Sequence, residues 1–462
     1  MALARMALLV LGPLEPFVLT KFNDLALCER VLRGVTAEGY ETPTPIQAQA
    51  IPHLLEGRDL LGIAQTGTGK TAAFALPTLN HIATVKAPKQ EKSVRGLILA
   101  PTRELVAQIA ENFRKYATSV RCRTEMVVGG VPINRQIRKL HRGCDVLVAT
   151  PGRLLDLSDR GAIDLSHVEV LILDEADQML DMGFIHDLKK IMAKVPDARQ
   201  SLLFSATMPK SIADLAAQYL KDPVKVSVTP ESTTAERVTQ GVLHVAQANK
   251  AKILSTVLKG EDVERALVFT RTKHGADKVL RMLAQSGLKA EAIHGNKTQS
   301  QRARSLKAFK SGECSILVAT DIAARGIDID GISHVVNFEM PNVPEQYVHR
   351  IGRTARAGRE GYALSLVADD EIYYLRAIEK ITGQMIDVLS PPAGCADVVL
   401  PTPDRNARVI KPKGPAGRGG GQQRPPRKAK PGAGKAGGKP QHGKPQAKAR
   451  RKPRPKRQAA HA

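Results

Sequence analysis

Short runs of aliphatic and β-branched residues recur along this chain, separated by longer segments in which apolar and polar residues mix. Four runs lie in the first half, at 96–100, 145–149, 168–174 and 201–204. Three more lie in the second half, at 266–270, 315–320 and 334–338. Strands that alternate with helical segments are typical of parallel sheets joined by crossover helices. The pattern therefore predicts an α/β fold.

The two halves share one strand phrase. Residues 144–150 read CDVLVAT, and residues 314–320 read CSILVAT. The shared phrase and the same order of elements predict two related α/β domains in tandem. We place the first domain at 21–225, a linker at 226–240 and the second domain at 241–393, because Pro230 and a Ser/Thr/Glu cluster interrupt the apolar pattern. The ends are an N-terminal segment of unknown role, 1–20, and a tail, 394–462.

Positive charge is concentrated in the tail. The chain carries a formal net charge of +24, and residues 401–462 contain 19 of its 69 Lys and Arg residues but only one acidic residue, Asp404. Gly and Pro occupy 21 of these 62 positions. Such a segment cannot bury enough apolar surface to offset the entropy of ordering, so we expect disorder. Its charge predicts binding to a polyanion, most simply nucleic acid, although a purely solubilising tail is an alternative.

The cysteines and the apolar runs indicate the compartment. Five scattered cysteines form no C-x-x-C pair, so neither a disulfide framework nor a zinc site is expected. No stretch reaches the roughly 18 apolar residues that span a bilayer. The apolar run at 7–11 lacks a signal-peptide cleavage pattern. We expect a cytoplasmic protein with no membrane partner.

Two motifs in order carry the chemistry. Residues 64–71 read AQTGTGKT, a glycine-rich turn whose backbone N–H groups can cradle phosphates while Lys70 reaches them and Thr71 ligates Mg²⁺. Residues 170–177 read VLILDEAD, an apolar strand that delivers Asp174 and Glu175 to its carboxyl end, where open α/β sheets bind ligands. One carboxylate can hold the metal while the other acts on a water molecule. Either motif alone could be an ordinary turn or an acidic helix start, but together they predict an ATPase.

The second half carries a basic row in place of a phosphate loop. Residues 349–356 read HRIGRTAR, which spaces Arg350, Arg353 and Arg356 three residues apart. On a helix this spacing puts side chains on one face. A solvated charged stripe is the simplest interpretation of such a row, but arginines from a second domain can also neutralise a transferring phosphate and make hydrolysis depend on domain closure.

From about residue 22 to 368, the chain resembles the DEAD-box RNA helicases of superfamily 2, and it looks most like their bacterial RhlE-type branch. The resemblance implies two RecA-like domains. Residues 39–47 (GYETPTPIQ) are similar to the Q motif, in which Gln47 would hydrogen-bond adenine and Phe22 would stack on the base. One departure is Ala355, which stands where the family usually has Gly.

The resemblance also implies residue roles. Lys70, Asp174, Glu175, Arg350 and Arg353 would be catalytic, and Thr71 and Asp174 would organise Mg²⁺, partly through water. The remaining ATP contacts would come from Thr66, Gly67, Thr68, Gly69 and, at the ribose, Asp328. Ser205 and Thr207 would couple hydrolysis to strand separation. The RNA contacts would be Pro101, Thr102, Arg103, Gly130, Thr150, Arg153, Arg271, Gly295 and Thr320, most of which offer donors to phosphates and sugars.

We therefore interpret the sequence as that of a monomeric ATP-dependent RNA helicase that opens short duplexes or remodels ribosomal or other ribonucleoprotein. Its cofactors would be ATP and Mg²⁺, and its partner RNA with little sequence specificity. Two alternatives remain: a DNA-directed superfamily 2 motor, and an RNA-binding or annealing protein whose tail does the main work.

Overall fold

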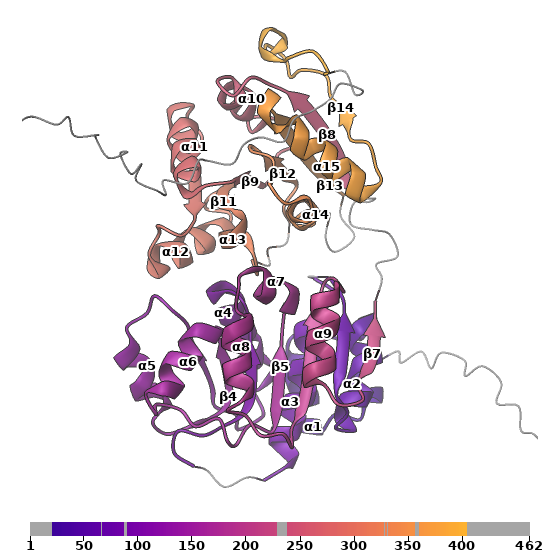
Figure 1. Cartoon of the computed structure of the whole chain (residues 1–462), viewed down its shortest axis with the longest axis vertical. Helices are drawn as coiled ribbons and strands as arrows, with labels where there is room; N and C mark the ends of the chain where they lie inside the picture. Colours follow the sequence, from indigo (N-terminus) through magenta and orange to yellow (C-terminus); the bar gives the residue numbers. More distant parts are fainter. Residues whose placement is uncertain are drawn as a thin grey trace, which may run out of the picture. The chain divides into compact units, whose positions relative to one another are not determined.

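The computed structural model of the chain describes residues 21–65, 67–86, 90–228, 238–327, 329, 331–355 and 360–403. The N-terminal segment, most of the expected linker and nearly all of the basic tail lie outside these ranges. Within them are two α/β domains, each built on a parallel sheet between layers of helices (Figure 1). The fold predicted from the sequence is confirmed.

The first sheet has seven strands in the order β3-β4-β2-β5-β6-β1-β7, all of them parallel. Their bounds are β1 (Leu60–Ile63), β2 (Val94–Leu99), β3 (Thr124–Val127), β4 (Cys144–Ala149), β5 (Val170–Leu173), β6 (Gln200–Ser205) and β7 (Val224–Ser227). The central strand β5 reads VLIL and is buried throughout. Strands covered on both faces need such continuous apolar runs.

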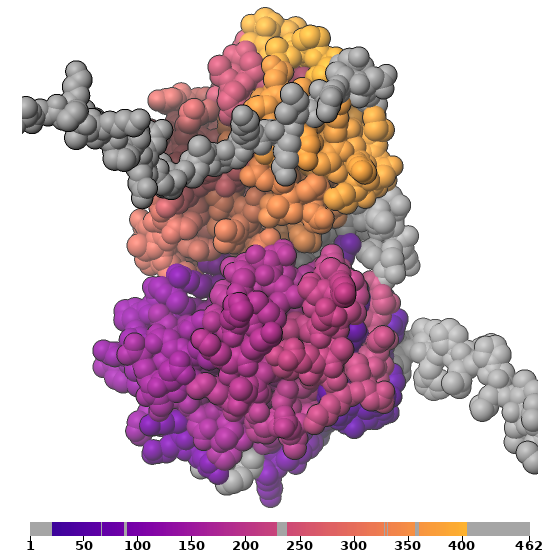
Figure 2. Space-filling model, in the orientation of Figure 1, coloured from indigo at the N-terminus to yellow at the C-terminus, as the bar shows by residue number. Residues whose placement is uncertain are grey.

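Two apolar clusters hold helices against the two faces of the first sheet. One cluster contains residues of α1 (Glu29–Ala37), α2 (Pro45–Leu55), α3 (Lys70–Thr84) and α4 (Arg103–Tyr116), with the short helix η1 (Phe22–Leu25) beside them. The other contains residues of α5 (Ile133–Leu140), α6 (Pro151–Asp159), α7 (Ala176–Asp181), α8 (Ile185–Met192) and α9 (Lys210–Tyr219). Figure 2 shows the visible face of this domain as a continuous surface of atoms.

The second sheet repeats this architecture in the order β10-β11-β9-β12-β13-β8-β14, also parallel. Its strands are β8 (Val238–His244), β9 (Ala266–Thr270), β10 (Ala290–Ile293), β11 (Ile316–Thr320), β12 (His334–Asn337), β13 (Gly361–Val367) and β14 (Asp387–Val388). The helices are α10 (Lys250–Val257), α11 (Lys273–Gln285), α12 (Gln299–Lys310), α13 (Asp321–Ala324), α14 (Pro344–Ile351) and α15 (Ile372–Thr382), with the 3₁₀ turns η2 (Asp369–Glu371) and η3 (Ala396–Val398). Among the described helices, none is long and apolar enough to cross a membrane.

Parallel strands carry all their carboxyl ends to one edge of each sheet. In the first sheet Leu97 on β2 pairs with Leu147 on β4 and Leu171 on β5, so these strands end side by side. The loops that follow them carry most of the chemistry-bearing motifs of the sequence. This common edge is where open α/β sheets bind ligands.

Residues 394–403, which the sequence places in the tail, pack on the second domain. Cys395 is 1% exposed and belongs to the apolar cluster under α10 and α11. Val399 forms an antiparallel bridge with Val245, and the Leu400 N–H donates to the His244 carbonyl at 2.6 Å. All five cysteines of the chain are free thiols.

This packing predicts different stabilities for two C-terminal truncations. A chain that ends at 393 loses the buried Cys395 and its aliphatic neighbours, which should destabilise the second domain by about 2 kcal/mol. A chain that ends at 403 keeps these contacts and should unfold at the full-length midpoint. Denaturant or thermal unfolding of both chains measures the difference, and equal midpoints would contradict the packing.

Candidate nucleotide and RNA sites

A cavity of about 650 Å³ opens at the carboxyl edge of the first sheet. It collects residues from the Q motif, the phosphate loop and the strand end of β5, which are far apart in sequence. Its lining includes Phe22, Gln47, Gly67, Gly69, Lys70, Thr71, Asp174 and Glu175. Most of the nucleotide-binding residues predicted for the first domain are thus brought together.

The phosphate loop needs two glycines in left-handed backbone conformation. Gly67 has φ 89° and Gly69 has φ 92°, a region that residues with a Cβ rarely adopt. Gly69 then caps the N-terminus of α3, where free N–H groups and the helix dipole favour an anion. The Thr68 hydroxyl donates to the Gln65 carbonyl at 2.8 Å and braces the turn. Thr66 lies outside the described residues.

Lys70 is the buried cation of this cavity. It is 6% exposed, and no hydrogen-bond partner for its Nζ exists among the described residues. A buried ammonium without a partner is unfavourable, because burial removes its hydration. Phosphate oxygens would supply the missing acceptors, so the arrangement fits the triphosphate of a nucleotide.

Gln47 connects the Q motif to the phosphate loop. Its Nε2 donates to the Gly69 carbonyl at 3.1 Å, and its Oε1 accepts from the Thr44 N–H at 2.9 Å. A Cβ added at Gly69 would lie 2.5 Å from Gln47 Nε2, so the close approach also requires glycine there. The amide retains one further N–H and one lone pair for a ligand. Gln47 therefore supports the loop whether or not it also contacts a base.

Phe22 is placed beside the cavity by local packing. The ring is 3% exposed and stacks with Tyr40 at a centroid distance of 6.4 Å. Tyr40 in turn contacts Tyr116 at 6.1 Å. Tyr40 is 41% exposed, so this aromatic group offers an apolar face at the mouth of the cavity.

Asp174 and Glu175 are buried carboxylates at the end of β5. Burial raises the pKa of Asp174, and the charge of Lys70 opposes this rise. Burial also raises the pKa of Glu175, and the neighbouring Asp174 charge adds to the effect. Glu175 Oε2 is buried without a partner among the described residues. An elevated pKa and a free buried oxygen suit a group that accepts a proton from water.

Glu175 also has an unusual backbone. Its φ of 54° and ψ of 51° are left-handed, which is uncommon for a residue with a Cβ. Such conformations persist where surrounding structure enforces them, and they concentrate at functional sites. Here the Glu175 N–H donates to Asp174 Oδ1 at 3.0 Å, which fixes the two carboxylates relative to each other.

Asp177 joins this site to the segment at 205–207. Its Oδ2 accepts from the N–H groups of Ala206 and Thr207 at 3.1 and 3.0 Å, and from the Thr207 hydroxyl at 3.0 Å. Ser205 Oγ donates to the Thr207 carbonyl at 2.7 Å. The family resemblance assigns coupling to Ser205 and Thr207 alone. We assigned no coupling role to Asp177 from the sequence, although its place at the end of the D-E-A-D tetrad could have indicated one.

Arg350 is placed differently from our expectation that it reaches a phosphate. The residue is 2% exposed, and its guanidinium pairs with both Asp321 oxygens, at 2.5 and 2.8 Å. Arg350 also donates to Asn337 Oδ1 at 3.0 Å and to the Glu339 carbonyl at 2.7 Å. The ring of Phe269 lies 5.0 Å from it. The guanidinium is therefore buried in the second domain, and four hydrogen bonds hold it there.

Arg353 and Ala355 follow on the same segment. Arg353 is 6% exposed and donates to the Ile327 carbonyl at 2.7 Å. Ala355 has φ 54°, so alanine adopts a left-handed conformation at the position where the family usually has glycine. This conformation costs an alanine about 1–2 kcal/mol. Arg356 and Asp328 lie outside the described residues.

All the expected RNA contacts of the first domain except Gly130 line a separate groove of about 460 Å³. Its first-domain lining includes Pro101, Thr102, Arg103, Gly129, Thr150 and Arg153. Gly130 has φ 73°, and a Cβ there would lie 2.0 Å from an Arg103 nitrogen. The glycine pair therefore lets the Arg103 guanidinium lie against the backbone.

Two helix starts shape this groove. Thr102 caps α4, where its hydroxyl accepts from the Leu105 N–H at 3.2 Å, and Thr150 precedes α6. Arg153 donates to the Val131 carbonyl at 2.9 Å. Gln136, which the sequence did not single out, brackets the same loop through hydrogen bonds to Val128 and Val131.

The remaining expected RNA residues lie on the second domain. Thr320 ends β11 and Arg271 follows β9, both at the carboxyl edge of that sheet. Arg271 contacts Glu339, Asn342 and Glu371. A Cβ at Gly295 would meet nothing within 4 Å, so this glycine faces open space.

Comparison with known proteins agrees with this geometry. The DEAD/DEAH box helicase family matches residues 44–215, and the helicase conserved C-terminal domain matches residues 249–358. The chain is 45% identical to the DEAD-box ATP-dependent RNA helicase CshA of Bacillus cereus over 374 residues, which is 81% of this chain and 70% of that one. CshA of Listeria monocytogenes is also 45% identical, with 81% and 71% covered.

A solved structure shows the same fold. Dbp5 of S. cerevisiae bound to RNA and ADP BeF3 is 30% identical to this chain, with a TM-score of 0.72 over 82% of this chain and 97% of Dbp5. The sequence motifs, the cavity with its unpartnered lysine and these similarities agree. The chain belongs to the DEAD-box ATP-dependent RNA helicases.

Proposed function

We propose that this protein hydrolyses ATP in the cavity of the first domain, in an RNA-dependent manner, to open short RNA duplexes or remodel ribonucleoprotein. The observation that carries the proposal is the buried Lys70, whose Nζ has no partner among the described residues and which lines the same cavity as two buried carboxylates. A triphosphate would supply the acceptors that Lys70 lacks. A purely structural role would leave the Lys70 ammonium buried without a hydrogen-bond acceptor, with only the charges of the nearby Asp174 and Glu175 to offset its burial.

Each side chain has a proposed task in the cavity. Lys70 and the backbone N–H groups from Gly67 to Gly69 would hold the phosphates. Thr71 and Asp174 supply hydroxyl and carboxylate oxygens, which suit Mg²⁺, and the ion when bound neutralises phosphate charge. Glu175 would orient the attacking water and accept its proton. Phe22 and the remaining donor of Gln47 would select adenine.

We propose different roles for the two arginines of the second domain. Arg353 remains the proposed phosphate contact, whereas the guanidinium of Arg350 is held by four hydrogen bonds inside its own domain. We propose that Arg350 holds Asp321 and the end of β12 in place. Closure of the domains around ATP and RNA would then complete the site, because the arginine and the phosphate loop come from different domains.

Coupling and RNA contact complete the proposal. The hydrogen bonds that Asp177 accepts from residues 206 and 207 connect the nucleotide strand to the expected coupling segment. Arg103, Arg153, Arg271 and the glycine pair would position the RNA backbone without reading its sequence. Asp328 at the ribose and Thr66 at the phosphates stay predictions from the family resemblance.

Broader features remain proposals. The relatives named above are CshA proteins, and assignment to the RhlE-type branch is a prediction that rests on motif resemblance alone.

We propose domains at 21–225 and 241–393 joined by the linker at 226–240, and the packed residues 394–403 argue for extending the second domain to 403. A monomer in the cytoplasm acting on structured RNA or ribosomal ribonucleoprotein is the expected state.

Replacing Glu175 with glutamine should separate binding from hydrolysis. Glu175→Gln keeps the side-chain shape but cannot accept a proton, so RNA-stimulated ATP turnover should fall by at least about 100-fold. Affinity for ATP and RNA should stay within a few-fold of wild type. Steady-state turnover and equilibrium binding of a labelled ATP analogue measure the two effects. The exposed Glu56→Gln serves as the matched control, and near-normal turnover in Glu175→Gln would refute its role.

The same assay distinguishes RNA from DNA. Turnover should rise with single-stranded RNA and much less with DNA of matching sequence, because contacts to the 2′-OH distinguish the two. Equal stimulation by both strands would favour the alternative of a DNA-directed motor.

The basic tail should contribute electrostatic RNA affinity. Removing residues 404–462 keeps the packed segment and should weaken RNA binding without changing ATP turnover in the absence of RNA. Each lost phosphate contact should reduce the slope of log affinity against log salt by about 0.7. Titrations at several salt concentrations measure this slope. An unchanged slope would exclude the tail as an RNA contact, whereas an isolated tail that anneals strands as well as the full chain would favour the annealing alternative.

A further inference from the structure

A lysine and a glutamate form an ion pair inside the second domain. Lys250 begins α10 and Glu371 immediately precedes α15. Both side chains are 0% exposed. The Lys250 ammonium donates to Glu371 Oε2. A buried pair of this kind persists only where further hydrogen bonds satisfy both charges.

Lys250 uses all three of its donors. Besides Glu371, its Nζ donates to the Phe338 carbonyl at 2.9 Å and to the Leu366 carbonyl at 2.7 Å. The Phe338 ring lies 5.9 Å from the same nitrogen. Phe338 directly follows β12, and Leu366 lies near the end of β13. Lys250 therefore fixes the carboxyl ends of two neighbouring strands.

Glu371 extends the network toward a third strand. Its Oε2 also accepts from the Ala368 N–H at 3.1 Å, and its Oε1 accepts from the Met340 N–H at 3.1 Å. Oε1 lies 3.3 Å from the guanidinium of Arg271, the residue that follows β9. One carboxylate thus connects the interior of the domain to a proposed RNA contact.

Arg271 is hydrogen-bonded to its own domain, and part of its side chain is exposed to solvent. The backbone N–H donates to Glu339 Oε2 at 2.7 Å, and the guanidinium contacts Asn342 Oδ1 at 3.5 Å. Its side chain is 24% exposed, whereas Glu371 beneath it is fully buried. The Glu371 charge is shared with Lys250, and Glu339 Oε1 lies 3.9 Å from the same guanidinium, so two carboxylates orient Arg271.

We propose that Glu371, held by Lys250, is a positioning residue that aims the Arg271 guanidinium at an RNA phosphate. The inference rests on the proposed RNA contact of Arg271. An arginine side chain gives up conformational freedom when it binds, and a side chain that is already oriented gives up less. Loss of the Glu371 charge should therefore weaken RNA affinity and leave the chemistry of ATP unaffected.

A double-mutant cycle tests this positioning. RNA-stimulated ATP turnover of the full-length protein is titrated with single-stranded RNA for wild type, Glu371→Gln, Arg271→Ala and the double variant. Glu371→Gln should raise the half-saturating RNA concentration about 5-fold, with the maximal rate within about twofold of wild type. In the Arg271→Ala background the second substitution should add nothing, because its route to RNA is gone.

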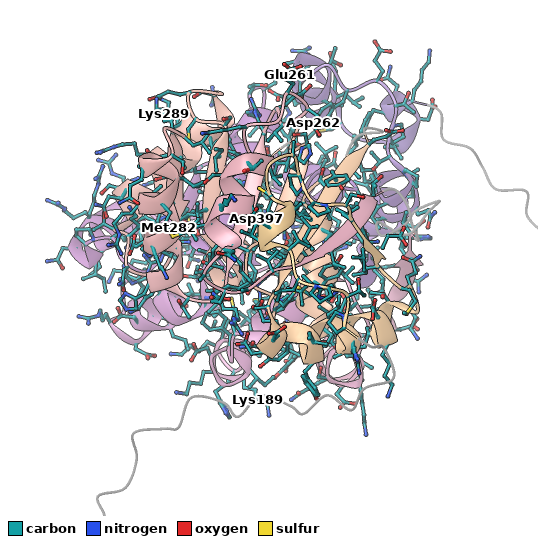
Figure 3. The ribbon with its side chains drawn as sticks, turned by 90° about the horizontal axis from the view of Figure 1, so that it is seen from above. Lys189, Glu261, Asp262, Met282, Lys289 and Asp397 are labelled. Carbon is teal, nitrogen blue, oxygen red and sulfur yellow. The ribbon has the colours of Figure 1, made fainter. Side chains whose placement is uncertain are left out.

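Asp397→Asn is the matched control. Asp397 pairs with Lys252 on the same helix α10 at 3.1 Å, but the pair is exposed, with 70% of the Asp397 side chain accessible. Figure 3 labels this residue. Its replacement should leave RNA titration unchanged. If Glu371→Gln lowers the unfolding midpoint too far for assay, Glu371→Asp is the second variant. It keeps the charge, but its shorter side chain no longer reaches the Arg271 guanidinium, so it should also raise the half-saturating RNA concentration.

Three outcomes would overturn the inference, and the first differs from the other two in what it says of Arg271. If Arg271→Ala leaves the RNA requirement unchanged, the proposed RNA role of Arg271 fails and the positioning role with it. If Arg271→Ala weakens RNA binding but Glu371→Gln does not, or if the two effects add in the double variant, Glu371 serves stability alone while the RNA role of Arg271 stands.

Discussion

Buried charge at the carboxyl ends of parallel strands is the constraint on which both domains depend. Burying a charge is unfavourable unless it is paired and hydrogen-bonded, so each such group must find partners in the fold or in a ligand. In the second domain two such pairs are complete, Arg350 with Asp321 and Lys250 with Glu371, whereas the buried Nε of Arg302 has no partner among the described residues. In the first domain Lys70 and Glu175 keep polar atoms without partners among the described residues. Lys70 and Glu175 are therefore the charged groups of this cavity whose free atoms a ligand could satisfy.

The sequence predicted best what depends on neighbouring residues. Gly67, Gly69 and Lys70 form one short turn, and the apolar run before Asp174 specifies a buried strand, so both follow from the local order of residues. The division into two parallel sheets followed from the same local alternation. These features need only spacing and residue type.

Contacts between distant segments were not predictable in this way. Arg350 was expected at a phosphate because its motif suggested one, but Asp321 and Asn337 lie 29 and 13 residues away and meet it only in the fold. Lys250 is fully buried, and nothing near it in sequence indicates this burial. Ala355 was visible as a departure from the family, whereas its left-handed backbone was visible only in the structure.

Gln47 illustrates how recognition and support can reside in one side chain. Because its amide bridges Thr44 and Gly69, a base that engages its remaining donor would act on a group already bonded to the phosphate loop. Binding of the base and binding of the phosphates would then be coupled through the Gln47 side chain.

The outer strands of the two sheets affect how readily the protein aggregates in concentrated solution. An edge strand exposes unpaired N–H and C=O groups, which can template pairing with another chain. Here one edge of the second sheet, β14, has only two residues, and the outer strand β7 of the first sheet has four, with the exposed Lys225 among them. Short and charged edges leave little room for strand addition. These two edges of the large parallel sheets are thereby poor templates for edge-to-edge pairing with another chain.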